Sequence, residues 1–138
     1  MRRTSHAVYE AKYHIVWCPK YRKKILVGAV RERVEEIFFE IGNQFEIEME
    51  KIAIAEDHVH LLVSFPPRYS ISKVVGIIKS ISSSKIFDEF PKIKEKLWGG
   101  HIWEQGYFVR TIGEQVTDDV IKNYIDHHSQ SFDQLTMF

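Results

Sequence analysis

The run from Asp57 to Phe65 constrains the fold more strongly than any other segment of the chain. From Val59 onward, apolar residues alternate with His60, Leu62 and Ser64, and this period of two predicts a β-strand. Residues i and i+2 of a strand point to the same face, so we expect His58 and His60 to project together while the intervening valine and leucine side chains face the core. Two imidazoles on one rigid strand would fix two positions of a metal site.

Other segments show strand periodicity on either side of this run. Residues 8–18 alternate as a first strand, which Pro19 should end. Residues 45–54 alternate as a second strand whose phase slips near Lys51, and a bulge is expected there. This second strand precedes the His58 strand closely enough to predict an antiparallel hairpin. Residues 97–110 are rich in turn residues and then become strand-like.

Three segments show helical spacing of their apolar residues. The first helix covers Val30 to Ile41, and Gly42 is placed to cap it. The second begins near Ile71 and stops at Pro91, and a third begins at Thr117. The resulting βαββαβ order predicts an α+β fold of the ferredoxin-like or RRM-like type, an antiparallel sheet with helices on one face. The additional C-terminal helix would carry Tyr124.

Length and composition set broad limits. We expect 138 residues, 44% of them hydrophobic, to form a single domain over residues 1–138. The chain has neither an apolar run long enough for a membrane helix nor the apolar stretch of a signal peptide near its start. Cys18 is the single cysteine, so it forms no intrachain disulfide and is expected to be a buried apolar residue. We therefore expect a cytoplasmic protein without a membrane partner.

The formal net charge is zero, but the charges are strongly segregated. Residues 1–33 have a net charge of +7 and residues 34–57 a net charge of −7. Local patches of charge, rather than the total, attract polyanions. The densest basic patch is Lys20-Tyr21-Arg22-Lys23-Lys24. On charge alone, a solvated loop is a better explanation of this patch than a nucleic-acid contact.

Two histidines do not complete a metal site, so a further ligand must come from elsewhere. His128 lies four residues after Tyr124, on the same face of the predicted helix. If that helix crosses the open sheet face, a bound metal could polarise a phosphate while the tyrosine phenol attacks phosphorus. Each feature also has a structural explanation, because a His-x-His pair or an apolar-stripe tyrosine commonly serves packing alone.

Taken together, several segments resemble the single-tyrosine HUH transposases (TnpA type) of insertion sequences that move as single-stranded DNA, the IS200/IS605 group. The resemblance covers nearly the whole chain. The segments that carry it are Tyr13-His14-Ile15-Val16-Trp17-Cys18-Pro19-Lys20-Tyr21-Arg22, Asp57-His58-Val59-His60-Leu61-Leu62, Gly106-Tyr107-Phe108-Val109 and Ile121-Lys122-Asn123-Tyr124-Ile125.

The resemblance implies Mg²⁺- or Mn²⁺-dependent cleavage and rejoining of single-stranded DNA. His58 and His60 would bind the metal, with His128 as the candidate third ligand, and Tyr124 would become linked to the 5′ phosphate. Members of the family are homodimers that recognise DNA hairpins near the ends of the element. They often have glutamine where this chain has His128, and three imidazoles would suit Zn²⁺ or another transition metal better than Mg²⁺.

The resemblance also assigns DNA contacts and leaves alternatives to the transposase. Phosphate or base contacts are expected from the residues Lys20, Tyr21, Arg22, Lys23, Lys24, Lys73 and Lys79. One alternative is a single-stranded nucleic-acid-binding module of the same fold that does not cleave. Another is a metal-dependent hydrolase that uses water as nucleophile. A third is a host-adapted relative that acts on repetitive palindromes. The sequence leaves open the hairpin and target sequences, and whether Tyr124 acts in its own subunit or the partner's.

Overall fold

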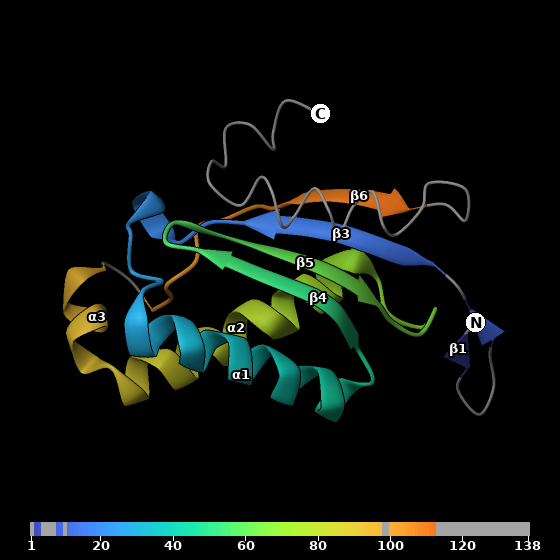
Figure 1. Ribbon diagram of the computed structural model, residues 1–138, viewed down its shortest axis with the longest axis horizontal. Helices are drawn as coiled ribbons and strands as arrows, with labels where there is room; N and C mark the ends of the chain where they lie inside the picture. Colours follow the sequence, from blue (N-terminus) through green and yellow to red (C-terminus); the bar gives the residue numbers. More distant parts are fainter. Residues whose placement is uncertain (1, 4–7, 10, 98–99, 113–138) are drawn as a thin grey trace.

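A four-stranded antiparallel sheet forms the centre of the computed structural model, which describes residues 2–3, 8–9, 11–97 and 100–112 (Figure 1). Its strands lie in the spatial order β4-β5-β3-β6. Their bounds are Lys12–Trp17 for β3, Glu48–Ala55 for β4, His58–Ser64 for β5 and Phe108–Ile112 for β6.

Helices α1 (Gly28–Phe45) and α2 (Ile71–Glu89) both lie against one face of this sheet (Figure 1). The chain order β3-α1-β4-β5-α2-β6, with β3 and β5 at the centre of the sheet, is the βαββαβ arrangement of ferredoxin-like folds. The predicted fold class is therefore confirmed. The predicted C-terminal helix and its Tyr124 lie outside the described residues.

The core lies between the sheet and the two helices. Val59, Leu61 and Val63 of β5 point into it, as their alternation predicts, together with Ile15 and Trp17 of β3. The helices contribute the apolar stripes of α1 and α2, which include the buried side chains Val34, Ile37, Phe38, Ile41, Val74, Val75 and Ile78. We call the opposite side of the sheet the histidine face, because His14, His58 and His60 alternate with these core residues along β3 and β5.

The hairpin between β4 and β5 is confirmed, and so is the bulge in its first strand. Ala55 pairs with His58, so only Glu56 and Asp57 form the turn. The register shifts between Met49 and Lys51, where the change of phase was expected. The bulge returns the apolar face of β4 to the core after the phase change.

The prediction that Gly42 caps the first helix is wrong. Gly42 is buried inside α1, and the left-handed C-cap is Glu46, with φ 60°. A Cβ at Gly42 would lie 2.5 Å from the carbonyl oxygen of Ile47. Glycine is required there because the chain folds back closely over the last helical turn, not because the helix ends.

Two further differences concern element boundaries. The first predicted strand is split: Val8–Tyr9 (β2) pairs with Arg2–Arg3 (β1) in a separate two-stranded sheet, and only β3 belongs to the main sheet. Pro91 follows the end of α2, as predicted, but it also starts a short helix, α3 (Pro91–Lys96). Proline suits a first helical position because its fixed φ is helical and the amide there needs no partner within the helix.

Within the described part of the chain, none of the helices has the length and apolar character needed to span a membrane.

Candidate metal and nucleic-acid site

Strand β5 brings His58 and His60 together on the histidine face, as predicted. Both side chains are fully buried, and their ring centroids are 4.8 Å apart. Adjacent same-face positions on a strand explain this proximity, because the backbone rather than a flexible loop sets their spacing.

The carboxylate of Asp57 orients His58. Nδ1–H of His58 donates to Oδ1 of Asp57 across 2.8 Å, and the Arg22 guanidinium donates to Oδ2 across 3.2 Å. Burial raises the pKa of the Asp57 carboxyl, but the hydrogen bond from His58 and the charge of Arg22 outweigh this effect and hold that pKa below its ordinary value. Asp57 is therefore an anion at neutral pH, and its contact leaves Nε2 as the ring nitrogen of His58 that can carry a lone pair.

A third histidine, His14 of β3, lies against His60. Nε2 of His14 and Nδ1 of His60 are 3.5 Å apart, with the hydrogen on one or the other according to tautomer. Burial, together with the smaller effects of the charges of His58 and His14, lowers the pKa of His60 to about 3. Burial, followed by the charge of Arg110, lowers the pKa of His14 to about 4. Both rings are therefore neutral at pH 7, the form in which imidazole binds metals.

These groups fit a metal site in part. Nε2 of His60 is buried and has no hydrogen-bond partner among the described residues. Burying such a nitrogen lowers the stability of the fold unless a metal ion or a hydrogen-bond donor binds to it. His58 and His60 could hold a divalent cation with two imidazole nitrogens. No set of three or more His, Cys, Asp or Glu side chains in the described ranges forms a metal site, and both the candidate third ligand His128 and the candidate nucleophile Tyr124 lie outside these ranges.

The basic segment lies beside this site. Lys20–Arg22 forms a short 3₁₀ turn (η1), in which Tyr21 and Arg22 both have positive φ, 60° and 50°. Tyr21 is 62% exposed, and Lys23 and Lys24 are exposed too. Arg22, by contrast, directs its guanidinium at Asp57. Exposed lysines and an exposed tyrosine are available for phosphate and base contacts.

The two lysines expected on α2 have different surroundings. Lys73 is exposed in the first turn, where its backbone amide donates to the Ser70 side chain. Lys79 is partly buried, and its ammonium donates to the carbonyls of Glu104 and Gly106, across 2.8 and 2.6 Å. Burial lowers the pKa of Lys79, although the charge of Glu104 opposes this change. A DNA contact by either lysine remains a prediction.

Comparison with known protein families tests the resemblance directly. Residues 7–128 match the family described as "Transposase IS200 like". The chain belongs to the IS200-like transposase family. This transposase is 37% identical to the ISDra2 transposase TnpA of Deinococcus radiodurans, over 91% of this chain and 89% of that protein. It is 32% identical to the transposase for insertion sequence element IS200 of Salmonella typhimurium, over 89% and 80% of the two chains.

Solved structures agree with the fold of this transposase. The crystal structure of a Deinococcus radiodurans R1 protein described as a transposase has a TM-score of 0.74 and 32% identity, covering 95% of this chain and all of that one. A REP-associated tyrosine transposase bound to a REP hairpin has a TM-score of 0.57 and 13% identity, covering 94% and 75% of the two chains. The second likeness concerns the fold alone.

Sequence reasoning missed three residues of the site of this transposase. No site role was predicted for His14, which contacts His60, for Asp57, which accepts from His58, or for Arg110, which pairs with His14 in the sheet. The position of Asp57 directly before the histidine pair was a usable signal for a carboxylate partner. The contact of His14 depends on the register between β3 and β5, which no local pattern specifies.

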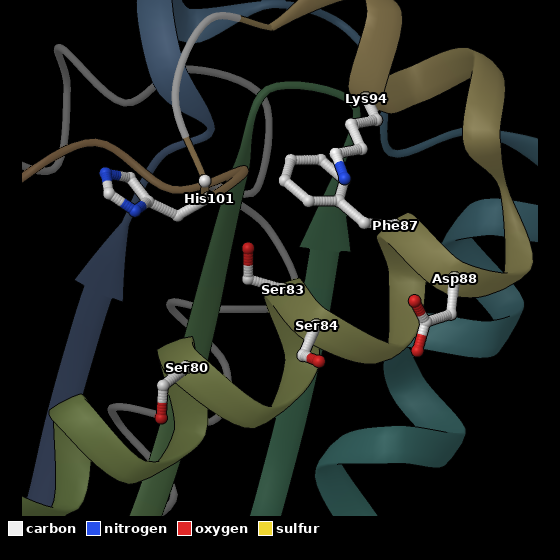
Figure 2. Close-up of a pocket in the computed structure, with 8 residues that line it drawn as sticks. Ser80, Ser83, Ser84, Phe87, Asp88, Lys94 and His101 are labelled. Atoms are coloured by element: carbon white, nitrogen blue, oxygen red, sulfur yellow. The ribbon is translucent and has the colours of Figure 1, made fainter.

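A cavity of about 300 Å³ lies elsewhere, between α2, α3 and the loop at Gly100 (Figure 2). Its lining includes Ser80, Ser83, Ser84 and Phe87 of α2, with Lys94 of α3 and His101 of the loop across from them. None of the predicted metal or DNA-binding residues among the described ones lines this cavity. It is separate from the histidine face.

Proposed function

We propose that this transposase cleaves and rejoins single-stranded DNA, with Tyr124 as nucleophile and with a divalent cation held by His58 and His60. The observation that supports this most directly is the pair of buried imidazoles on one strand, each of which has its Nδ1 against a polar partner. A cation in this position would act as a Lewis acid on the scissile phosphate. His60, kept neutral by burial, has the ligand form throughout the neutral pH range.

The proposed step conserves the phosphodiester. The phenolic oxygen of Tyr124 forms a bond to phosphorus, and the bond from phosphorus to the 3′ oxygen breaks. The phenol gives up its proton to a base, and the departing 3′ oxygen takes one up to become a 3′-OH. Because a phosphotyrosine ester replaces the original ester, a free 3′-OH can reverse the reaction and join strands without an external energy source.

We also propose that the DNA substrate carries hairpins and that the protein works as a homodimer on the ends of a mobile element. The relative with the REP hairpin has the same fold, and the exposed lysines beside η1 provide a positive surface next to the histidine face. Action on host repetitive palindromes is the neighbouring alternative. Mg²⁺ and Mn²⁺ are both candidates for the cation, and the two imidazole ligands favour Mn²⁺ or another transition metal.

A covalent adduct tests the proposed chemistry. The transposase is incubated with a labelled single strand that contains a hairpin, in Mg²⁺, Mn²⁺ or Zn²⁺, and denaturing gels are used to detect protein-linked label. We expect an adduct with the wild type and none with Tyr124→Phe, which removes only the attacking oxygen. Tyr69→Phe is the matched control, because Tyr69 is partly buried and lies beyond the end of β5 that is farther from His58 and His60. This substitution should leave the adduct unchanged.

Two other results would contradict the proposal. Tight binding of the hairpin without any adduct, in all three metals, would indicate a binding module without cleavage. Cleavage that releases free 5′ phosphate and survives Tyr124→Phe would indicate hydrolysis by water.

A further inference from the structure

Each of the paired histidines has a partner of its own on Nδ1. Asp57 lies 2.8 Å from Nδ1 of His58, and His14 lies 3.5 Å from Nδ1 of His60. The two partners belong to different segments, the β4–β5 turn and the central strand β3. Both contacts are made by the same ring nitrogen, which leaves Nε2 of each ring on the other side.

We propose that Asp57, held by Arg22, and His14 are positioning residues that fix His58 and His60 in the tautomer with hydrogen on Nδ1 and a lone pair on Nε2. This inference rests on the proposed function, because it takes the cation as the ligand of the two Nε2 atoms. In an isolated imidazole the hydrogen moves between the two nitrogens. A partner that accepts from Nδ1 removes this freedom and increases the basicity of the other nitrogen.

The backbone segment that carries Arg22 is held in place by hydrogen bonds to two other parts of the chain. The amide of Lys20 donates to the carbonyl of Ile102 across 2.7 Å, and that of Leu26 donates to Glu56 across 3.1 Å. The segment between them is thereby tied both to the loop before β6 and to the β4–β5 turn. It contains two successive positive φ values at non-glycine residues, a conformation that costs free energy and persists only where the surroundings enforce it. The guanidinium is delivered to Asp57 by this fixed backbone.

The His14 side is fixed by the sheet. His14 pairs with Leu62 in the register of β3 and β5, which brings its ring to 5.7 Å from that of His60, centroid to centroid. Phe108 of β6 packs edge-on against the other side of His14, at 6.3 Å. A neutral His14 with a lone pair on Nε2 can accept the hydrogen from Nδ1 of His60. No change of backbone is needed for this.

Nuclear magnetic resonance can test the tautomers without metal or DNA. Long-range proton–nitrogen correlation spectra of the full-length protein with ¹⁵N-labelled histidine distinguish protonated from unprotonated ring nitrogens. We expect Nδ1 to be protonated in both His58 and His60 of the wild type. In Asp57→Ala, His58 should become a mixture of tautomers while His60 is unchanged. In His14→Phe, which keeps a ring of similar size, the reverse should hold.

Metal affinity provides the second measurement. Binding of Mn²⁺ alone, followed by electron paramagnetic resonance, should weaken roughly 10- to 100-fold in Asp57→Ala, the range typical for loss of a group that orients a metal ligand. Asp57→Asn keeps an acceptor and should recover part of the loss. Glu56→Ala is the matched control, because Glu56 is the exposed neighbour in the same turn and its loss changes the net charge equally.

The outcomes separate this inference from the proposed function. Spectra of the wild type that show hydrogen on Nε2 of His58 or His60 would overturn this inference. It would also be overturned if Asp57→Ala and His14→Phe both kept the tautomers and the Mn²⁺ affinity of the wild type. Equal weakening by Glu56→Ala would show that charge alone is responsible, and would overturn it as well. If the tautomers and affinities change as expected but no DNA adduct forms, the positioning role stands and the proposed strand cleavage fails.

Discussion

Lys79 places its charged ammonium group at the edge of the apolar core. Its ammonium binds two carbonyls of the segment before β6 and lies 5.6 Å from the centre of the Trp17 ring. The resemblance to single-tyrosine transposases placed this lysine among the expected DNA contacts. Its contacts within the protein give it a structural task, which is to hold the Glu104–Gly106 segment against α2.

Replacement of Lys79 by methionine separates these two roles. We expect Lys79→Met to lower the free energy of unfolding by about 2 kcal/mol, because hydrogen bonds from a charged, partly buried donor are lost. Lys73→Met, at an exposed position on the same helix, should leave stability unchanged. Urea unfolding measures both. Unchanged stability in Lys79→Met, with weaker binding of hairpin DNA, would instead support the contact predicted from sequence.

At the scale of elements, the end of α1 shows how one residue type permits a tight connection. The chain leaves the helix through the left-handed Glu46 and passes over Gly42, whose carbonyl accepts from the amide of Ile47 across 2.9 Å. Met49 also packs near this point. The close approach allows β4 to start directly beneath the helix from which the chain has just emerged.

Two glycine substitutions test this account of the connection. A Cβ in Gly42→Ala would meet a backbone oxygen, which cannot move aside as a flexible side chain can, so we expect a loss of about 1–3 kcal/mol in the free energy of unfolding. Gly76→Ala is the control, because an added Cβ at this exposed α2 position meets no atom within 4 Å among the described residues. It should raise stability by about 0.5–1 kcal/mol. Equal effects in urea unfolding would contradict the steric explanation.

Elements with a strong local period were predictable, and those set by contacts between segments were not. The alternation in β5, the stripes of α1 and α2 and the bulge in β4 all follow from residue order alone. The separate pairing of Val8–Tyr9 and the helix that starts at Pro91 depend on where the neighbouring chain lies. For the site, the strand period predicted the shared face of His58 and His60, whereas the contact of His14 required the pairing of β3 with β5.

For the whole molecule, charge is distributed unequally around the sheet. The exposed Lys23 and Lys24 follow η1, and Arg22 of that turn reaches Asp57 directly before the paired histidines. The acidic run of residues 34–57 instead falls largely on α1 and β4. A zero net charge therefore conceals a positive region beside the candidate site. Such a region can attract a polyanion although the molecule as a whole is neutral.

The salt dependence of DNA binding measures how many phosphate contacts this positive region makes. Simultaneous replacement of Lys23 and Lys24 by alanine should weaken binding of a hairpin-bearing single strand and make the plot of log affinity against log salt shallower by roughly 1.4 to 1.8, since each lost phosphate contact removes a released counterion. Lys85 and Lys92, on the helical side of the sheet, provide a control pair with the same loss of charge. A wild-type slope in the Lys23 and Lys24 variant would refute the assignment.

The β4–β5 turn has a practical consequence for engineering. Only Glu56 and Asp57 separate the paired residues Ala55 and His58, so the turn has no spare length. A peptide tag or reporter inserted there would separate a carboxylate from the ring it orients, even if the hairpin still formed. The connection from Pro66 to Ser70, at the far end of the same strand, is a better insertion point, because lengthening it leaves that pairing and both imidazole contacts in place.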